Sequence, residues 1–385
     1  MDYLQQLLNN QPVEWKKLGE VCTKVCSGGT PSTSNPEYYK GNIPWLRTQD
    51  VDWKDVYDTD IKITEEAIKN SSAQWIPANC VIVAMYGATA AKACINRIPL
   101  TTNQACCNLQ VDENIAHYKY VYHWICREYE RLRALGEGSQ SNLSGKKIKD
   151  YKIPIPPLSV QSRIVEILDK FTAMEAELQA ELELRKKQYA YYREQLLNFS
   201  YTPPSEFNVV YKKLGEVAEI GTGRSNRKDE VTDGAYPFYV RSKNILRSST
   251  YQFDETAIVI PGEGGIGDIF HYVVGKYALH QRAYRIRLQS EEQVLSKFLY
   301  YYMTSAFKGF IVSKSVGATA TSIRKPMIEE FPIPLPPLSE QQRIVEILDK
   351  FDTLTNSISE GLPLEIQLRR QQYEYYREQL LDFRN

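Results

Sequence analysis

One stretch of this chain occurs twice, and it constrains the fold more than any other feature. Residues 156–171 read PPLSVQSRIVEILDKF, and residues 336–351 read PPLSEQQRIVEILDKF. The two copies lie 180 residues apart and differ at only two positions. A repeat of this length indicates that one structural unit has been used twice. We therefore expect a chain built from two related halves.

Each copy opens a predicted long helix. The Pro-Pro pair cannot belong to a preceding helix, and Ser159 or Ser339 is suited to cap the helix that follows. Apolar residues then recur at alternating spacings of three and four, which is typical of a coiled coil. A helix over residues 159–199 would be roughly 60 Å long. The predicted seam of the first helix contains Ile164, Leu168, Phe171, Leu178, Leu182, Tyr189, Tyr192 and Leu196.

The second helix keeps this pattern and then slips. The sequence YYREQLL at 191–197 returns at 375–381, which is four residues later than the repeat requires. Gly361 and Pro363 lie at the slip, so we expect a kink or a break there. The predicted seam of the second helix contains Ile344, Leu348, Phe351, Ile358, Tyr373, Tyr376 and Leu380.

The segments between the helices share an outline. WKKLGEV at 15–21 matches YKKLGEV at 211–217, and strands, a helix and a polar loop are predicted after each,. In the first segment we expect strands at 43–47 and 81–85, a helix at 118–135 and a polar loop at 136–145; the second polar loop is expected at 313–325. The predicted division is a globular domain over 1–153, a long helix over 154–200, a second globular domain over 201–333 and a second long helix over 334–385.

Composition limits the class of protein. Lys plus Arg and Asp plus Glu both number 47, which argues against binding nucleic acid by charge alone,. All seven cysteines lie in the first third of the chain without a C-x-x-C pair, which favours free thiols in a reducing cytoplasm over a zinc site,. There is neither a signal peptide nor an apolar run long enough for a bilayer. We expect a cytoplasmic protein without a bound metal or a membrane partner.

The motifs of enzymes are poorly matched. Residues 262–267 fit G-x-G-x-x-G, but a dinucleotide site needs a helix next, and residues 270–274 are predicted to form a strand,. A glycine hairpin is the simpler interpretation. We find no Ser/His/Asp constellation and no methyltransferase tetrapeptide of the Asn-Pro-Pro or Asp-Pro-Pro type. The sequence therefore predicts a protein without an active site of its own.

Taken together, the pattern resembles the DNA-specificity subunit of type I restriction–modification systems over essentially the whole chain. The repeated motif Pro-Pro-Leu-Ser-x-Gln-x-Arg-Ile-Val carries most of the resemblance, because its duplication at this spacing is specific. IPWLR at 43–47 and TNQ at 102–104 add to it, whereas the second domain has His280-Gln281 in place of Asn-Gln.

The resemblance implies an α+β fold in which two similar target-recognition domains are separated by two long helices, paired as an antiparallel coiled coil with a pseudo-two-fold repeat. It implies that each domain reads half of a split, asymmetric site in double-stranded DNA. Two methyltransferase subunits and the restriction subunits would assemble on this frame. S-adenosylmethionine and ATP with magnesium would bind those partners, and no cofactor would bind this chain.

Candidate DNA contacts are polar residues in loops and at strand ends, because Arg and Lys suit guanine while Asn and Gln suit adenine. By contrast, Asn103 and Gln104 are expected to satisfy backbone groups inside their domain. The candidates in the first domain are Arg47, Thr48, Gln49, Asn142, Lys146 and Lys147. Those in the second are Arg224, Ser225, Asn226, Arg227, Arg241, Lys243, Asn244, Arg324 and Lys325.

The residues alone also allow an alternative function. Duplication and a heptad seam also suit a coiled-coil scaffold whose two globular domains bind protein. The DNA target and its spacer length do not follow from either interpretation.

Overall fold

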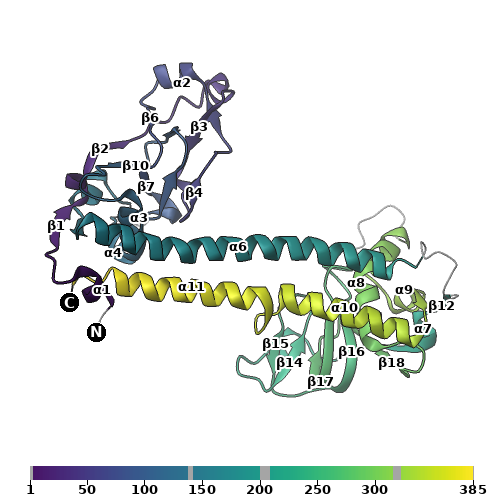
Figure 1. The fold of residues 1–385 in the computed structure, drawn as a ribbon. Helices are drawn as coiled ribbons and strands as arrows, with labels where there is room; N and C mark the ends of the chain where they lie inside the picture. Colours follow the sequence, from purple (N-terminus) through teal and green to yellow (C-terminus); the bar gives the residue numbers. More distant parts are fainter. Residues whose placement is uncertain (1–2, 138–141, 200–208, 315–321, 385) are drawn as a thin grey trace. The chain divides into compact units, whose positions relative to one another are not determined.

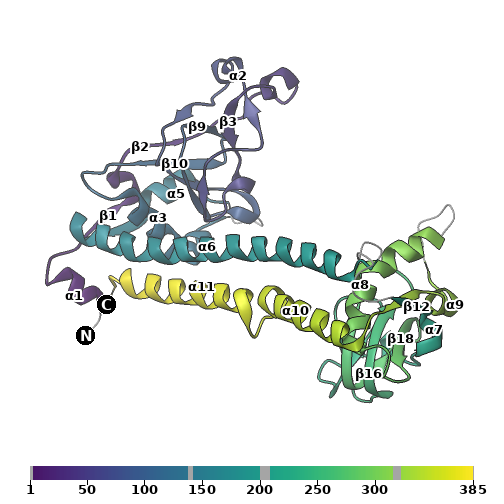
Figure 2. The same ribbon diagram turned by 45° about the vertical axis from the view of Figure 1, so that its right-hand side comes forward.

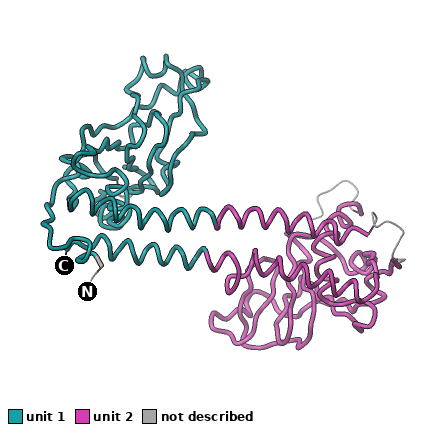
Figure 3. Tube along the Cα trace, in the orientation of Figure 1, with its two compact units in different colours: residues 1–177, 366–385 teal, residues 178–365 magenta. Residues whose placement is uncertain are grey.

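The computed structural model describes residues 3–137, 142–199, 209–314 and 322–384. It divides into two compact units, which are coloured separately in Figure 3. Unit 1 comprises residues 1–177 and 366–385, and unit 2 comprises residues 178–365. Each unit contains one globular part and a portion of the two long helical segments (Figure 1). The expected α+β class is confirmed, because each globular part combines sheets with packed helices.

Unit 1 has a five-stranded sheet in the order β2-β10-β7-β8-β4 and a four-stranded sheet in the order β5-β3-β9-β6. The short strands β1 and β11 form an antiparallel pair at the start of the long helix. Its helices are α1 (Tyr3–Leu8), α2 (Glu65–Lys69), α3 (Tyr118–Arg127), α4 (Tyr129–Ala134) and α5 (Gly145–Asp150). Its strands are β1 (Glu14–Lys17), β2 (Cys22–Ser27), β3 (Ile43–Leu46), β4 (Asp55–Val56), β5 (Lys62–Ile63), β6 (Trp75–Ile76), β7 (Val81–Ala84), β8 (Ala93–Asn96), β9 (Leu100–Thr102), β10 (Cys106–Val111) and β11 (Lys152–Ile155).

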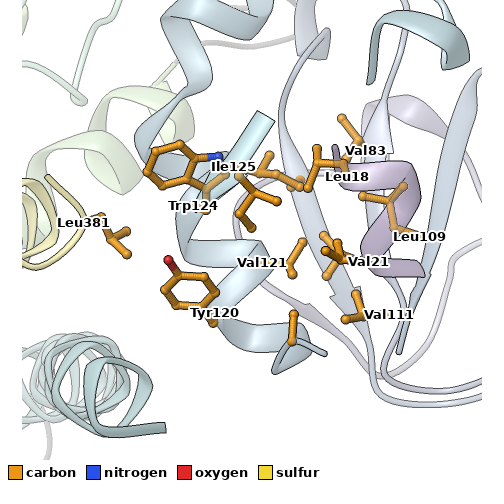
Figure 4. Close-up of a cluster of buried hydrophobic side chains, with 14 of the residues drawn as sticks. Leu18, Val21, Val83, Leu109, Val111, Tyr120, Val121, Trp124, Ile125 and Leu381 are labelled. Carbon is orange, nitrogen blue, oxygen red and sulfur yellow. The ribbon is translucent and has the colours of Figure 1, made fainter. Parts of the chain in front are cut away.

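The main core of unit 1 lies between its larger sheet and α3. Figure 4 shows Val121, Trp124 and Ile125 of α3 with Val83 and Leu109 of the sheet. Residues from α1 and from the end of the chain belong to the same buried cluster, among them Leu4, Leu8, Leu380 and Leu381. The first and last helices of the described chain are therefore both anchored in this core.

Unit 2 has one six-stranded sheet in the order β13-β18-β16-β17-β14-β15, and β12 pairs with β19 as β1 pairs with β11. The predicted glycine hairpin is confirmed, because β16 and β17 are antiparallel neighbours joined by residues 262–270, which include the glycines at 262–267. Its strands are β12 (Val210–Lys213), β13 (Ala218–Thr222), β14 (Tyr236–Tyr239), β15 (Leu246–Ser248), β16 (Phe253–Pro261), β17 (His271–Leu279), β18 (Ala283–Leu288) and β19 (Pro332–Leu335). Its helices are α7 (Leu214–Val217), α8 (Ser296–Lys314) and α9 (Lys325–Glu329).

The long helical segments are α6 (Leu158–Leu197), α10 (Leu338–Asn356) and α11 (Gly361–Leu380). In unit 1, α6 lies beside α11: Phe171 stacks on Tyr376 with ring centroids 5.1 Å apart, and Arg370 pairs with Glu175. In unit 2, α6 lies beside α10 (Figure 2). Tyr189 stacks on Phe351 there, with ring centroids 6.0 Å apart. Since Phe171 and Glu175 meet partners in descending order along α11, the helices run antiparallel in unit 1, and the predicted pairing of the seams holds in each unit.

The break predicted near Gly361 is present, because α10 ends at Asn356 and α11 begins at Gly361, whose φ is +77°. A side chain on Gly361 would also approach the carbonyl of Thr353 to 2.5 Å, so glycine suits this turn,. The prediction that Ile358 belongs to the seam is wrong. It lies in the connection between the helices and is 83 % exposed.

Two further predictions need correction. Ser339 does not cap its helix, because Pro337 is the N-cap residue and its carbonyl already accepts the amide of Gln341 at 3.0 Å; Ser159 likewise lies inside α6. The helix expected over 118–135 is two helices that meet at Glu128, whose buried carboxylate bonds to Arg127 and Arg131. No helix among the described residues is long and apolar enough to cross a membrane.

Candidate nucleic-acid interface

Each unit contains a short pair of parallel strands whose ends bring several loops together. These pairs are β3 with β9 in unit 1 and β14 with β17 in unit 2. The residue that follows β9 or β17 is held by the same backbone hydrogen bond in both units. The amide of Asn103 donates to the carbonyl of Leu46 at 2.9 Å, and the amide of His280 donates to the carbonyl of Tyr239 at 2.9 Å.

A glycine allows a second loop to pass against this strand end. A Cβ atom at Gly28 would lie 1.9 Å from the carbonyl oxygen of Thr102, and one at Gly223 would lie 1.8 Å from that of Leu279. Both distances are far inside van der Waals contact, so a side chain cannot be placed at either position. The loops that follow Gly28 and Gly223 are therefore held beside corresponding strand ends in the two units.

A third connection in unit 1 attaches the loop before α5. The amide of Met85 donates to the carbonyl of Ala105, and the carbonyl of Met85 accepts from the amide of Leu143, both at 2.8 Å. The predicted polar loop at 136–145 includes residues 138–141, which lie outside the described residues. Its described residue Asn142 is brought to the end of β7 by this connection.

Unit 2 repeats the connection with other residues. The amide of Gly262 donates to the carbonyl of Arg282, and the carbonyl of Gly262 accepts from the amide of Ile323, both at 2.9 Å. Arg324 is therefore tied to the same edge, although residues 315–321 of its predicted loop lie outside the described residues. One backbone frame thus carries two different sets of side chains.

Arg47 is the most strongly held of the predicted contacts in unit 1. Its Nε and Nη2 donate to the two carboxylate oxygens of Asp50 at 3.2 and 3.3 Å. With the Gln49 amide oriented so that its oxygen faces Arg47, that oxygen lies 2.8 Å from Nη2 and 3.1 Å from Nη1. The guanidinium therefore has partners on all three of its nitrogens.

The remaining predicted DNA contacts of unit 1 differ in whether their polar groups already have partners inside the unit. The carbonyl of Thr48 accepts from Thr89 Oγ1 at 2.8 Å, and Asn142 exchanges backbone hydrogen bonds with Glu137. Lys147 is used internally, because its ammonium donates to the carbonyl of Leu135 at 2.8 Å and also contacts Glu137. Lys146 is exposed on the first turn of α5.

In unit 2, the loop over residues 223–229 has an ordered backbone and exposed cationic side chains. The side chain of Gln252 accepts from the amide of Arg224 at 3.0 Å and donates to Ser225 Oγ at 2.5 Å. Asn226 caps the short 3₁₀ turn over Arg227–Asp229 by accepting the amide of Lys228. Nε of Arg227 lies 3.7 Å from Glu230, but the Arg227 side chain is 85 % exposed, so a ligand can still reach its charge.

The other predicted contacts of unit 2 lie on neighbouring segments. Arg241 follows β14 and donates to Glu263 at 2.8 Å, while Lys243 and Asn244 are exposed in the connection to β15. Arg324 and Lys325 start α9, where Lys325 lies 3.6 Å from Glu329. The frame described above brings the segments of Arg224, Arg241 and Arg324 to one end of the sheet.

Sequence reasoning missed Glu263 and Arg282. Nη1 of Arg282 donates to Glu263 at 3.0 and 3.3 Å, so this carboxylate contacts two arginines from different segments. The hydrogen bond from Arg282, assisted by Arg241, lowers the pKa of Glu263 below its ordinary value. Burial, together with the nearby charges of Arg241 and Arg282, lowers the pKa of His280, which favours its neutral form.

The prediction that Asn103 and Gln104 satisfy backbone groups is wrong. Gln104 Oε1 accepts from the hydroxyl of Thr30, and the buried Oδ1 of Asn103 has no partner among the described residues. Asn108 takes the expected role instead. Its Nδ2 donates to the carbonyl of Cys26 at 3.2 Å and to Thr102 Oγ1 at 2.9 Å. The sequence gives no spacing signal that distinguishes these two asparagines.

The repeated motif has its own polar anchor, a buried glutamine at the start of each long helix. In unit 1, Gln161 Oε1 accepts from the amide of His117 at 2.9 Å, and its Nε2 donates to the carbonyl of Pro156 at 2.8 Å. In unit 2, Gln341 accepts from Leu295 at 2.8 Å and donates to Pro336 at 2.9 Å. The glutamine thereby joins the globular part to its helix in both halves.

An aspartate of the motif makes a second connection. In unit 1, Asp169 contacts Lys119 and lies 3.1 Å from Nε2 of the buried His123. In unit 2, Asp349 lies 3.3 Å from Lys297 and accepts from the hydroxyl of Tyr301. These contacts account for the glutamine and the aspartate of the repeated motif, because both helices must join the same kind of domain.

Metal-ligating clusters are absent from the described part of the chain, where no group of three or more His, Cys, Asp or Glu side chains could hold an ion. The cysteines carry free thiols. Burial raises the pKa of the Cys80 and Cys126 thiols to about 12, so both remain protonated at neutral pH,.

The family model for the type I restriction modification DNA specificity domain matches the chain twice, at residues 10–184 and 205–368. A putative type I restriction enzyme specificity subunit of Haemophilus influenzae is 32% identical over 99% of this chain and 98% of its own length. The specificity subunit of the Escherichia coli type I restriction enzyme EcoR124I/EcoR124II is 38% identical over 71% of this chain and 72% of its own length.

Solved structures share the fold. The type I restriction-modification S subunit from M. genitalium aligns with a TM-score of 0.61 at 15% identity and covers 98% of both chains. A second chain aligns with a TM-score of 0.60 at 16% identity and covers 96% of this chain and 98% of its own length. It comes from a structure that describes complex assembly and conformational transition of the type I restriction–modification system.

Proposed function

The chain belongs to the family of type I restriction–modification DNA specificity subunits, and on that premise we propose that it reads a bipartite, asymmetric target in double-stranded DNA. It is a specificity subunit rather than a catalytic one. Residues 1–153 and 201–333 are the two recognition domains, and residues 154–200 and 334–385 are the helices that connect them. Each domain reads one half of the target.

The observation that carries this proposal is the duplicated frame with different side chains. In both units, a glycine loop lies against the residues after a parallel strand pair, and the segment before α5 or α9 is tied by backbone hydrogen bonds to the end of β7 or β16. Loops on a rigid scaffold are the usual site of recognition. Since the frame is shared and its side chains differ, the two domains read different base sequences.

Contacts of two kinds follow from the geometry. Exposed cations in the loops, such as Lys146, Arg224, Arg227 and Lys243, contact phosphates and set the register,. Side chains held by neighbours contact base edges, because a fixed donor discriminates between bases better than a mobile one. Arg47, which is held by Asp50, is a candidate for contact with a base edge. The remaining candidates for DNA contact are Thr48, Gln49, Asn142, Ser225, Asn226, Asn244, Arg324 and Lys325.

The chain acts as the organiser of a larger complex. Two methyltransferase subunits bind the helices and the flanks of the domains, and restriction subunits join them in the full assembly. S-adenosylmethionine is bound by the methyltransferase subunits, and ATP with magnesium by the restriction subunits. The two near-identical motifs support two equal partners, because equal partners need equal surfaces.

A salt titration tests DNA binding. The full-length chain, alone and with its methyltransferase subunits, is titrated against duplex DNA that carries the methylated motif of its host and against a scrambled duplex. We expect preference for the motif and an affinity that falls with salt. The triple variant Arg224→Ala, Arg227→Ala, Lys243→Ala should reduce the slope of log affinity against log salt by about 0.9 for each phosphate that the variant no longer neutralises.

The matched control, measured on the chain without its partner subunits, replaces Lys170, Lys186 and Lys187, three cations of α6, by alanine and should leave that slope unchanged. A wild-type complex that binds both duplexes equally at every salt concentration would support the coiled-coil scaffold with two protein-binding domains instead.

A further inference from the structure

Three segments of unit 2 meet in a cluster of two arginines and one glutamate. Arg241 follows β14, Glu263 lies in the turn between β16 and β17, and Arg282 lies in the turn between β17 and β18. These four strands are labelled in Figure 1. Nη1 of Arg241 donates to Glu263 Oε2 at 2.8 Å, and Nη1 of Arg282 donates to the same oxygen at 3.0 Å. All three side chains are partly exposed, from 36% to 57%, so a ligand can reach them.

The backbone under this cluster is fixed. The amide of Gly262 donates to the carbonyl of Arg282 at 2.9 Å, and a Cβ atom at Gly262 would lie 2.8 Å from that oxygen. The amide of Arg282 also donates to Nδ1 of the buried His280 at 3.0 Å. The segments that carry Glu263 and Arg282 are therefore held in close register, and Glu263 in turn fixes both arginine side chains.

The guanidinium N–H groups of Arg241 and Arg282 that do not bind Glu263 form a defined pattern of donors. Within the described residues, the hydrogen bonds to Glu263 engage Nη1 of each guanidinium, which leaves the Nε and Nη2 groups of Arg241 and Arg282 for a ligand. These two N–H groups are parallel and match a pair of acceptors on one planar molecule. In the major groove, N7 and O6 of guanine form such a pair.

The glutamate argues for a base rather than a phosphate. A carboxylate 2.8 Å from Arg241 and 3.0 Å from Arg282 repels a phosphate but not the neutral edge of a base,. It also holds each side chain in one orientation, which contact with a phosphate does not require. The described residues of unit 1 do not repeat the arrangement: Tyr86 follows Met85 where Glu263 follows Gly262, and Arg47 has partners on all three nitrogens.

We propose that Glu263 is a positioning residue that holds Arg241 and Arg282 as two fixed forks, and that these forks read two guanines in the half-site of the second domain. This inference rests on the proposed DNA-recognition function and names the base that this site selects. The first domain reads its half-site without such a pair of forks.

The test uses the full-length chain with its methyltransferase subunits. The methylated motif of the wild-type complex is first defined by sequencing the methylated genome of an expressing host. Binding is then measured on duplexes that carry each single-base change in either half-site. Glu263→Ala and Arg282→Lys are compared with Glu292→Gln, which removes an exposed carboxylate of the same unit.

For wild type we expect at least two guanines to be required in one half-site. Glu263→Ala should reduce discrimination at both guanines by about tenfold, and Arg282→Lys should do so at one of them. In the other half-site, the variants should discriminate between bases within twofold of wild type, which also shows that they are folded. Glu292→Gln should match wild type in both half-sites.

Two results would overturn the inference. A wild-type motif without guanine in the affected half-site, or variants whose discrimination stays within twofold of wild type, would reject the two forks while the recognition function stands. A wild-type complex with no sequence preference on any duplex would reject the recognition function, and the inference with it.

Discussion

Nε2 of His123 lies 3.1 Å from Oδ1 of Asp169, and this pair joins α3 to α6 inside unit 1. Nδ1 of His123 lies 3.1 Å from the hydroxyl of Tyr373, so a neutral imidazole that donates from Nε2 satisfies both partners. In unit 2, Tyr301 takes the place of the histidine and donates to Asp349. The two halves thus make the same connection with a titratable group in one and a non-titrating group in the other.

The histidine makes the stability of unit 1 sensitive to acid. Burial lowers the pKa of His123 below its ordinary value of 6.5, despite the opposing charge of Asp169. Because the folded pKa is depressed, the contribution of neutral His123 is complete above pH 6.5 and is lost as the pH falls toward the folded pKa,. Lys119 and Arg377 also face this ring and disfavour its protonation.

We predict that His123→Tyr removes this sensitivity, because tyrosine stays neutral and can donate to Asp169 as Tyr301 does to Asp349. Between about pH 7 and pH 5, wild type should lose up to about 2 kcal/mol more free energy of unfolding than the variant. Urea unfolding followed by circular dichroism at each pH measures the difference. Parallel losses in the two proteins would show that His123 does not titrate on unfolding.

The buried glutamines of the repeated motif should be important for stability. Replacing Gln161 or Gln341 by alanine leaves the amide and carbonyl groups that it binds without partners in a buried site. We expect each replacement to lower the free energy of unfolding by about 2–4 kcal/mol, since each unsatisfied buried group costs about 1–3 kcal/mol. Gln342→Ala is the matched control, because Gln342 is adjacent and exposed and bonds only to Glu346 among the described residues.

Urea unfolding of the three variants gives the comparison. Equal stabilities of Gln341→Ala and Gln342→Ala would contradict the assigned role of the buried glutamine.

The seam should also be sensitive to charge. Leu168 and Leu348 are fully buried in the cores of units 1 and 2, and aspartate at either position would bury an unpaired carboxylate. We expect each replacement to lower the free energy of unfolding by at least about 3 kcal/mol. On gel filtration, neither variant should form a stable assembly with methyltransferase subunits. Leu184→Asp is the control for stability on the same helix, because Leu184 is 65% exposed and its replacement by aspartate buries no charge. Co-elution of the Leu168→Asp, Leu348→Asp double variant with its partners would argue against the seam as the basis of the frame.

The helices could be predicted closely because their signals are local and repeated. Alternating apolar residues, the Pro-Pro pair and the slip at Gly361 all lie within a few turns of helix. Ile358 was misassigned because the apolar spacing continues to this residue, two positions past the end of α10 at Asn356. A periodic pattern does not by itself show where the backbone leaves the helix.

The site could be predicted only in part, because it depends on strand order. Arg241 and residues 224–227 stood out as polar residues in loops and at strand ends. Glu263 and Arg282 did not, since their pairing arises from the hairpin of β16 and β17 and from the turn into β18, which place them together in space. Asn103 and Asn108 differ in the same way, because only the fold decides which amide faces the backbone.

The central claim is that each domain reads its own half of the target, and exchange of one domain tests it most directly. Residues 207–330 are replaced by the corresponding segment of a related specificity subunit, and the methylated motif is read by sequencing the genome of a host that expresses the complete system. The account predicts that one half of the motif changes to that of the donor while the other half keeps its sequence. A change in both halves, or in neither, would contradict it.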